Sequence, residues 1–163
     1  MKKAILITSL LLAGTLAKAQ TGVHSPEVRA KDSTVMKDIF EPMAAEAANN
    51  ETTPDWSGLK TTLTAKYGAD YAERFTWEAK VYFDYSRDWP AFCTALIYYT
   101  NTYESMDDLR RLNINAKMIL DNSSDPQQLQ TALGWSKRTV DKDSANADYQ
   151  KTYTALQAKL AAK

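Results

Sequence analysis

Carboxylates are the most numerous side chains in this sequence that are able to perform chemistry. Seven of them lie in its middle: Asp84, Asp88, Glu104, Asp107, Asp108, Asp121 and Asp125. A glycosidase-like enzyme needs two carboxyl groups facing each other across a cleft. However, Asp88, Asp107 and Asp125 stand at expected helix starts, where a carboxylate caps backbone N–H groups, and Asp84 falls on an expected exposed face. The pattern therefore predicts no catalytic residue, and we expect a protein that is not an enzyme.

Nucleophilic, metal and cofactor chemistry would have to use a single histidine and a single cysteine. His24 lies in a polar N-terminal stretch and has no companion ligands, so neither a metal site nor a Ser/His/Asp set is expected. Cys93 sits in a helix-like run, which favours a buried, small hydrophobic residue. The alternative is a reactive or intermolecular thiol. No CxxC and no glycine-rich phosphate-binding motif occurs, so we expect no cofactor.

Aromatic residues are the remaining candidates for binding. Tryptophans stand at 56, 77, 89 and 135, and tyrosines at 71, 82, 85, 98, 99 and 103. They could line a ligand groove, but stripes at helical spacing are more typical of a core. Tyr98 falls off the main stripe of its helix. It is therefore the residue we expect to be an exposed interaction contact.

The N-terminal segment has the pattern of an export signal over residues 1–19. Lys2 and Lys3 precede an apolar stretch from Ile5 to Leu16, and Ala17-Lys18-Ala19 forms a cleavage site before Gln20. The alternative, a membrane anchor, is disfavoured because the apolar stretch is short for a bilayer span. We expect a periplasmic or secreted protein of a Gram-negative type bacterium, with no stable membrane insertion after cleavage.

Removal of the signal changes the charge of the chain. It takes away three lysines and no acid, which leaves 17 basic and 20 acidic residues and a formal charge of −3. A nucleic-acid-binding protein normally carries a basic face. The mature chain is therefore not expected to bind nucleic acid.

Hydrophobic spacing in the mature chain predicts an all-α fold of about seven helices, because apolar and polar residues do not alternate by two. We expect residues 20–33 to be a flexible N-terminus and residues 34–163 to be a single domain. The expected helices cover 34–49, with a kink or restart at Pro42, then 56–67, 69–87, 89–103, 109–120, 126–142 and 147–160. Asp55 is expected to cap the second of these helices, and Gly68 is expected to end it in the left-handed conformation.

The last two helices show the expected architecture best. Asp125-Pro126 starts the first, and Gln128 is placed to close a capping box. The apolar faces are Leu129, Ala132, Leu133, Ser136 and Val140 in one helix, and Tyr149, Tyr153, Leu156 and Leu160 in the other. A turn of four residues between them requires an antiparallel pair. The sequence thus predicts stacked antiparallel helical hairpins.

These residues also carry a family resemblance. The chain resembles a tetratricopeptide-like (TPR-like) helical region at Leu112-Asn113, Ala116, Asp125, Ala132-Leu133, Trp135-Ser136-Lys137, Asn146-Ala147-Asp148-Tyr149, Thr152-Tyr153 and Lys159-Leu160. More narrowly, the chain from Asp55 to Lys163 resembles the region that follows the thioredoxin domain in some exported bacterial thioredoxin-family proteins. The thioredoxin domain itself has no counterpart here, because no CxxC precedes Asp55. The resemblance implies a helical-repeat fold and transfers no redox residue.

The sequence is compatible with three functions. The preferred one is an exported, non-catalytic helical-repeat module that binds a protein or peptide or serves as a scaffold. The second is an accessory or remnant of a thioredoxin-family redox protein that acts with a partner supplying the CxxC. The third is a hydrolase or lectin-like binder that uses the aromatic and acidic residues.

Overall fold

The computed structural model describes residues 25–162, which form an all-α fold without a strand. The expected signal peptide, His24 and Lys163 lie outside the described residues. The elements are α2 (Pro26–Val35), the π-helix η1 (Met36–Phe40), α3 (Glu41–Asn49), α4 (Trp56–Tyr67), α5 (Ala69–Ser86), α6 (Trp89–Tyr103), α7 (Leu109–Asn122), α8 (Pro126–Lys142) and α9 (Ala147–Ala161).

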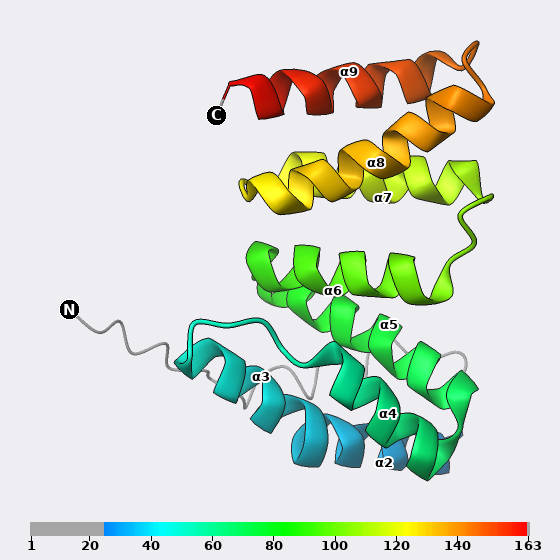
Figure 1. Cartoon of the computed structure of the whole chain (residues 1–163). Coiled ribbons are helices and arrows are strands. Elements are labelled where there is room, and N and C mark those ends of the chain that lie inside the picture. Colours follow the sequence, from blue (N-terminus) through cyan, green and yellow to red (C-terminus); the bar gives the residue numbers. More distant parts are fainter. Residues whose placement is uncertain (1–24, 163) are drawn as a thin grey trace.

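Consecutive helices in this fold pack on one another as a stack (Figure 1). α2, η1 and α3 follow without a gap, so residues 26–161 make seven helical rods, as the sequence predicts. The α4/α5, α5/α6, α7/α8 and α8/α9 pairs make the main contacts between rods. α6 also contacts α8, and α7 contacts α9, so each hairpin rests on the next.

The first rod begins earlier than the sequence predicts. Residues 26–33 are helical, whereas residues 20–33 were expected to be a flexible N-terminus. Ser25 accepts a hydrogen bond from the Val28 N–H at 3.3 Å, and Pro26 occupies the first helical position. Both are standard helix-start signals. The sequence did not predict this helix because the rod is held by tertiary contacts of Asp32 and Val35, which its weak hydrophobic period does not reveal.

Pro42 widens this rod rather than interrupting it. A proline inside a helix lacks an N–H and its ring clashes with the carbonyl four residues earlier. In this chain the preceding turn is the π-helix η1, in which the Glu41 N–H donates to the Met36 carbonyl. The wider i→i+5 turn accommodates the ring without a break. The expected kink or restart at Pro42 therefore takes the form of a π-helical segment.

Most helices start at an acidic or amide cap. Asp55, Asp88, Asp125 and Asn146 each accept backbone N–H groups of their own first turn, and for the three aspartates this was predicted. The cap of α7 is Asp108 and not Asp107. The capping box at Gln128 does not form, because the Asp125 N–H donates to Ser123 Oγ at 3.0 Å. Gln128 Nε2 instead donates to Thr94 Oγ1 on α6 at 3.1 Å.

Two glycines are explained by close approach and by backbone conformation. A Cβ on Gly58 would lie 2.3 Å from Asp55 Oδ2, so glycine leaves room for the cap of α4. Gly68 joins α4 to α5 with φ 92° and ψ 164°. The positive φ favours glycine, as predicted, but the ψ places the residue outside the left-handed helical region that was expected.

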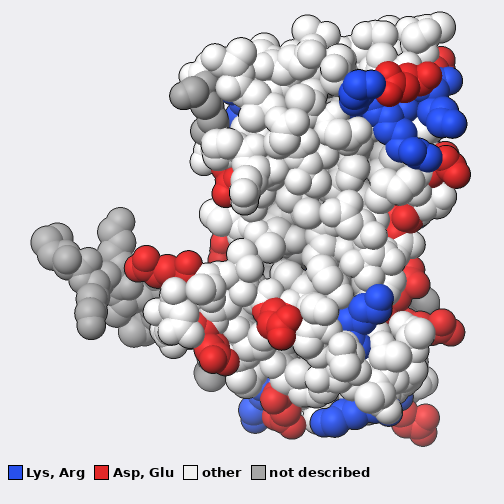
Figure 2. Space-filling model, viewed as in Figure 1, with Lys and Arg blue, Asp and Glu red and all other residues white. Residues whose placement is uncertain are grey.

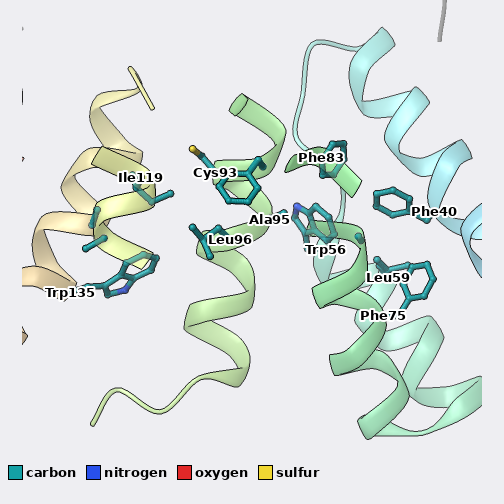
Figure 3. Close-up of a cluster of buried hydrophobic side chains, with 14 of the residues drawn as sticks. Phe40, Trp56, Leu59, Phe75, Phe83, Cys93, Ala95, Leu96, Ile119 and Trp135 are labelled. Carbon is teal, nitrogen blue, oxygen red and sulfur yellow. The ribbon is translucent and has the colours of Figure 1, made fainter. Parts of the chain in front are cut away.

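The hydrophobic core runs through the whole stack. Figure 3 shows Phe40, Trp56, Leu59, Phe75 and Phe83 on one side of α6 and Ile119 and Trp135 on the other, with Cys93, Ala95 and Leu96 between them. Phe40 contacts the rings of Trp56, Phe75, Tyr82 and Phe83 at centroid distances of 5.6–6.2 Å. Such tilted and edge-to-face pairs add to the free energy gained by burial.

Some helical faces are rotated relative to the sequence prediction. In α8 the buried residues are Leu129, Ala132, Trp135, Ser136 and Thr139, while Leu133 and Val140 are half-buried. In α5 the buried row is Ala72, Phe75, Thr76, Ala79, Lys80 and Phe83. Tyr85, one of the aromatic residues that the sequence favoured as core, is 62% exposed. The sequence favoured Tyr85 as a core residue because its side chain is large and aromatic. Its smaller neighbours fit better between packed helices.

Surface charge is unevenly distributed. α6 contains no Lys, Arg, Asp or Glu, and α8 has none before Lys137. In the view of Figure 2, charged residues gather at the corner of the α8–α9 turn, and the centre of the face is free of them. Within residues 25–162, no helix is long and apolar enough to cross a membrane.

Candidate binding cleft between α5 and α7

An open cleft lies between α5 and α7. Its volume is about 510 Å³, and it is lined by Asp70, Glu73, Arg74, Trp77, Tyr99 and Arg111, which define the α5–α7 cleft. A second hollow of about 250 Å³ continues it toward the α6–α7 connection and shares Glu73, Tyr99 and Arg111. The two hollows thus share one residue each from α5, α6 and α7.

Helical spacing explains why these side chains meet. On α5, Asp70, Glu73 and Trp77 are separated by three and four residues, which places them on one face. Tyr99 reaches the cleft from the end of α6, and Arg111 from the first turn of α7. The Trp77 and Tyr99 rings pack edge to face at a centroid distance of 5.3 Å. Trp77 is 39% exposed, whereas Tyr99 is 8% exposed and forms the floor.

Arg74 is paired within the protein. It donates from Nη1 and Nη2 to the two carboxylate oxygens of Asp32 on α2, at 2.9 and 2.6 Å, and it also pairs with Glu78. Tyr71 OH donates to Asp32 Oδ1 at 2.9 Å. The hydrogen bond to Asp32 raises the pKa of Arg74, and burial together with the same carboxylate raises the pKa of Tyr71. Arg74 therefore fastens α2 to α5 and is not free to bind a ligand.

Arg111 is also occupied. Its guanidinium lies 3.4 Å from Glu104 Oε1 and 3.7 Å from Asp108 Oδ2. Glu104 in turn accepts a hydrogen bond from Asn115 Nδ2 at 2.6 Å, and Asn115 also donates to Thr100 at 2.9 Å. These bonds hold the α6–α7 connection at one end of the cleft.

Asp70 and Glu73 differ from the other charged residues of the cleft. Glu73 Oε1 accepts a long hydrogen bond of 3.4 Å from Tyr99 OH. No hydrogen bond or ion pair from residues 25–162 reaches the Asp70 carboxylate. Burial and the Glu73 charge raise the pKa of Tyr99 to about 12, so Tyr99 keeps its proton at neutral pH. Both carboxylates are exposed and lack a cationic partner in the described part of the chain.

Lys80 is the most unusual side chain near the cleft. It is 5% exposed, and its Nζ lies 3.3 Å from the centroid of the Trp77 ring and 5.9 Å from that of Phe92. This ammonium donates no hydrogen bond to any of the described residues. Burial lowers the pKa of Lys80 to about 8, against the opposing effect of Glu104 and Asp84. The ring of Trp77 is thus the main partner of a buried cation.

The residues proposed from sequence take different places. Tyr98, expected as an exposed contact, is half-buried and packs against the core: it stacks on Trp56 at 6.0 Å and meets Tyr103 edge to face at 6.4 Å. Tyr103 lines the second hollow. Asp107, expected as a cap, instead accepts a hydrogen bond from Arg138 at 2.8 Å.

Cys93 is fully buried, as the sequence favoured. Burial raises the pKa of its thiol to about 11, which leaves little thiolate at neutral pH. A mixed disulfide through Cys93 would require the core to open. The buried thiol therefore argues against the version of the accessory redox role in which Cys93 forms a mixed disulfide with a partner.

Neither the exposure of Trp77 nor the burial of Lys80 was predicted. Trp77 lies off the stripe that contains Phe75 and Ala79, and this offset was the available signal. Lys80 lies four residues after Thr76 and three before Phe83, so it shares their buried face. Lysine is rarely assigned to such a face because buried charges are costly.

The arrangement of the cleft is suited to binding. Within residues 25–162, no group of three or more His, Cys, Asp or Glu side chains is placed to hold a metal ion. The cleft presents an exposed indole, a tyrosine floor and two carboxylates that have no cationic partner in the described part of the chain. Comparisons with protein-family models, curated proteins and solved structures find no match for this chain.

Proposed function

We propose that the mature chain is an exported, non-catalytic helical-repeat module that binds a protein or peptide through the α5–α7 cleft. The observation that carries this proposal is the exposure of Trp77 beside Tyr99, at the point where two helices of the stack are separated. Exposed aromatic residues in concave sites are typical anchors for partners. The signal-like N-terminus supports a periplasmic or secreted location, and the TPR-like resemblance supports a binding role.

The proposal is tested by capture from a cell-envelope extract with chemical crosslinking. The variant Trp77→Ser removes the anchor, and Tyr85→Ser is the matched control, because Tyr85 is an exposed aromatic residue of the same helix that does not line the cleft. We expect crosslinked species that the wild type and Tyr85→Ser form and Trp77→Ser loses. The cleft is not the binding site if all three proteins give the same species, and a wild type that captures nothing above background rejects the binding role.

A further inference from the structure

The charges of the α5–α7 cleft do not balance within the protein. The two arginines that line it are already paired, Arg74 with Asp32 and Glu78, and Arg111 with Glu104 and Asp108. Asp70 and Glu73 have no cationic partner in residues 25–162. Asp70 lies in the first turn of α5, where a carboxylate also complements the helix dipole. The charge left for a ligand is therefore negative.

The aromatic surface next to these carboxylates is suited to a cation. A positive group is attracted to the face of an indole ring, and Lys80 Nζ already occupies such a position at 3.3 Å from the centroid of Trp77. Part of the ring remains exposed to the cleft. Glu73 lies four residues before Trp77 on the same helix, so a carboxylate and an aromatic ring are neighbours on one face.

We infer that the α5–α7 cleft takes a basic side chain, arginine or lysine, of a partner protein or peptide. The cationic head pairs with Asp70 and Glu73, and its aliphatic stem lies along Trp77 and Tyr99. A charge-assisted hydrogen bond to a carboxylate is stronger than one between neutral groups, so this contact selects basic segments. This inference rests on the proposed function, since it names the kind of partner that the same cleft receives.

The test is an NMR titration of the full chain with two blocked tripeptides. The probe is N-acetyl-Gly-Arg-Gly-amide, and its control carries citrulline, which has nearly the shape of arginine but no charge. We expect saturable shifts of the Trp77 indole N–H with the arginine peptide, and affinity for the citrulline peptide that is lower by about tenfold. Binding of the arginine peptide should also weaken as salt is added.

A pair of charge-matched variants locates the site. Asp70→Asn/Glu73→Gln removes both cleft carboxylates, and Glu27→Gln/Glu46→Gln removes two exposed carboxylates of α2 and α3. We expect the first variant to bind the arginine peptide about tenfold more weakly and the second to bind it as the wild type does. Circular dichroism and thermal melting check that both variants keep the fold.

The outcomes separate this inference from the proposed function. Equal affinity for the arginine and citrulline peptides overturns the preference for a cation but leaves peptide binding in the cleft intact. Unchanged affinity in Asp70→Asn/Glu73→Gln places the cation elsewhere and also overturns it. Spermidine binding as tightly as the arginine peptide, with the same variant dependence, identifies a free polyamine as the occupant and overturns the assignment to a protein partner. The absence of any shift with the arginine peptide rejects the inference, while capture by crosslinking still decides the proposed function.

Discussion

The two sides of α7 meet their neighbours differently. On one side α7 packs on α9, while on the other side α7 and α5 are held apart and the cleft lies between them. Leu112, Ala116 and Ile119 are the buried apolar residues of α7, and Thr152 and Leu156 are the buried residues of α9. Small and aliphatic side chains let helices approach closely.

The α5–α7 side has large and charged residues in the corresponding place. Trp77, Tyr99 and Arg111 occupy the space between the helices, and Lys80 lies beneath the indole. Such side chains keep the backbones apart, and their polar groups need either protein partners or water. Side-chain size and charge therefore decide whether successive hairpins close on one another or leave a binding surface.

The largest expected effect is on the closed side. Leu156→Ala removes a fully buried side chain from α9, so it should lower the free energy of unfolding by about 2 to 5 kcal/mol. Leu160→Ala, in the last turn of α9, is the control because Leu160 is half-buried and should cost less. Urea denaturation followed by circular dichroism measures both. Equal costs for the two variants would contradict the view that Leu156 is the main apolar contact of α9.

This difference between the two sides shows what the sequence can reveal. Spacing of apolar residues predicted the seven rods, and Asp55, Asp88 and Asp125 marked three helix starts, because caps and helical periods are local properties. The position of the cleft is not local. It depends on Trp77 and Arg111, which come from different helices, and on the orientation of each rod about its axis.

Tyr98 is less exposed than predicted for the same reason. A helical wheel places Tyr98 off the main stripe of α6, but α4 brings Trp56 beneath it and covers one face of its ring. A single helix can show which residues share a face but not which neighbour covers that face. Lys80 was assigned no role because its buried position depends on Trp77 and Phe92 together.

Replacing Lys80 tests whether a buried charge beside the α5–α7 cleft lowers the free energy of unfolding. Because the pKa of Lys80 falls from 10.5 to about 8, the buried ammonium lowers the stability at neutral pH by roughly 3 kcal/mol. Lys80→Met keeps a long apolar side chain, so it should raise the free energy of unfolding by about 1 to 3 kcal/mol at pH 7. Lys66→Met, at an exposed position in α4, should have little effect.

The sign of the pH dependence follows from the same shift. Between about pH 8 and pH 10.5 the unfolded chain binds a proton that the folded chain has released, so the Lys80 contribution makes stability rise with pH. Below about pH 8 both states are protonated and the full cost is present. The difference in unfolding free energy between Lys80→Met and the wild type should therefore shrink from pH 7 to pH 10. A constant difference would mean that Lys80 is hydrated.

Replacing Asp32 tests how the cleft-lining Arg74 holds α2 on α5. Asp32→Asn removes the negative charge and one of the two oxygens that accept hydrogen bonds from Arg74 and Tyr71, and should cost about 1 to 2 kcal/mol in unfolding free energy. The expected loss of unfolding free energy is small for a charged pair because the Arg74 side chain is 27% exposed and can be hydrated. Asp38→Asn, at an exposed position in η1, is the control. Faster amide hydrogen exchange in α2, without change in α8 and α9, should accompany the loss.

The smallest expected effect on stability belongs to the cleft surface itself. Trp77→Ser removes one edge-to-face contact with Tyr99 but also lets water reach Lys80, so the two changes oppose each other. We expect a net change within about 1 kcal/mol, close to that of Tyr85→Ser. Urea denaturation at pH 7 measures it. A loss as large as that of Leu156→Ala would show that Trp77 is a core residue, and the two sides of α7 would then differ only in the size of the side chains that close them.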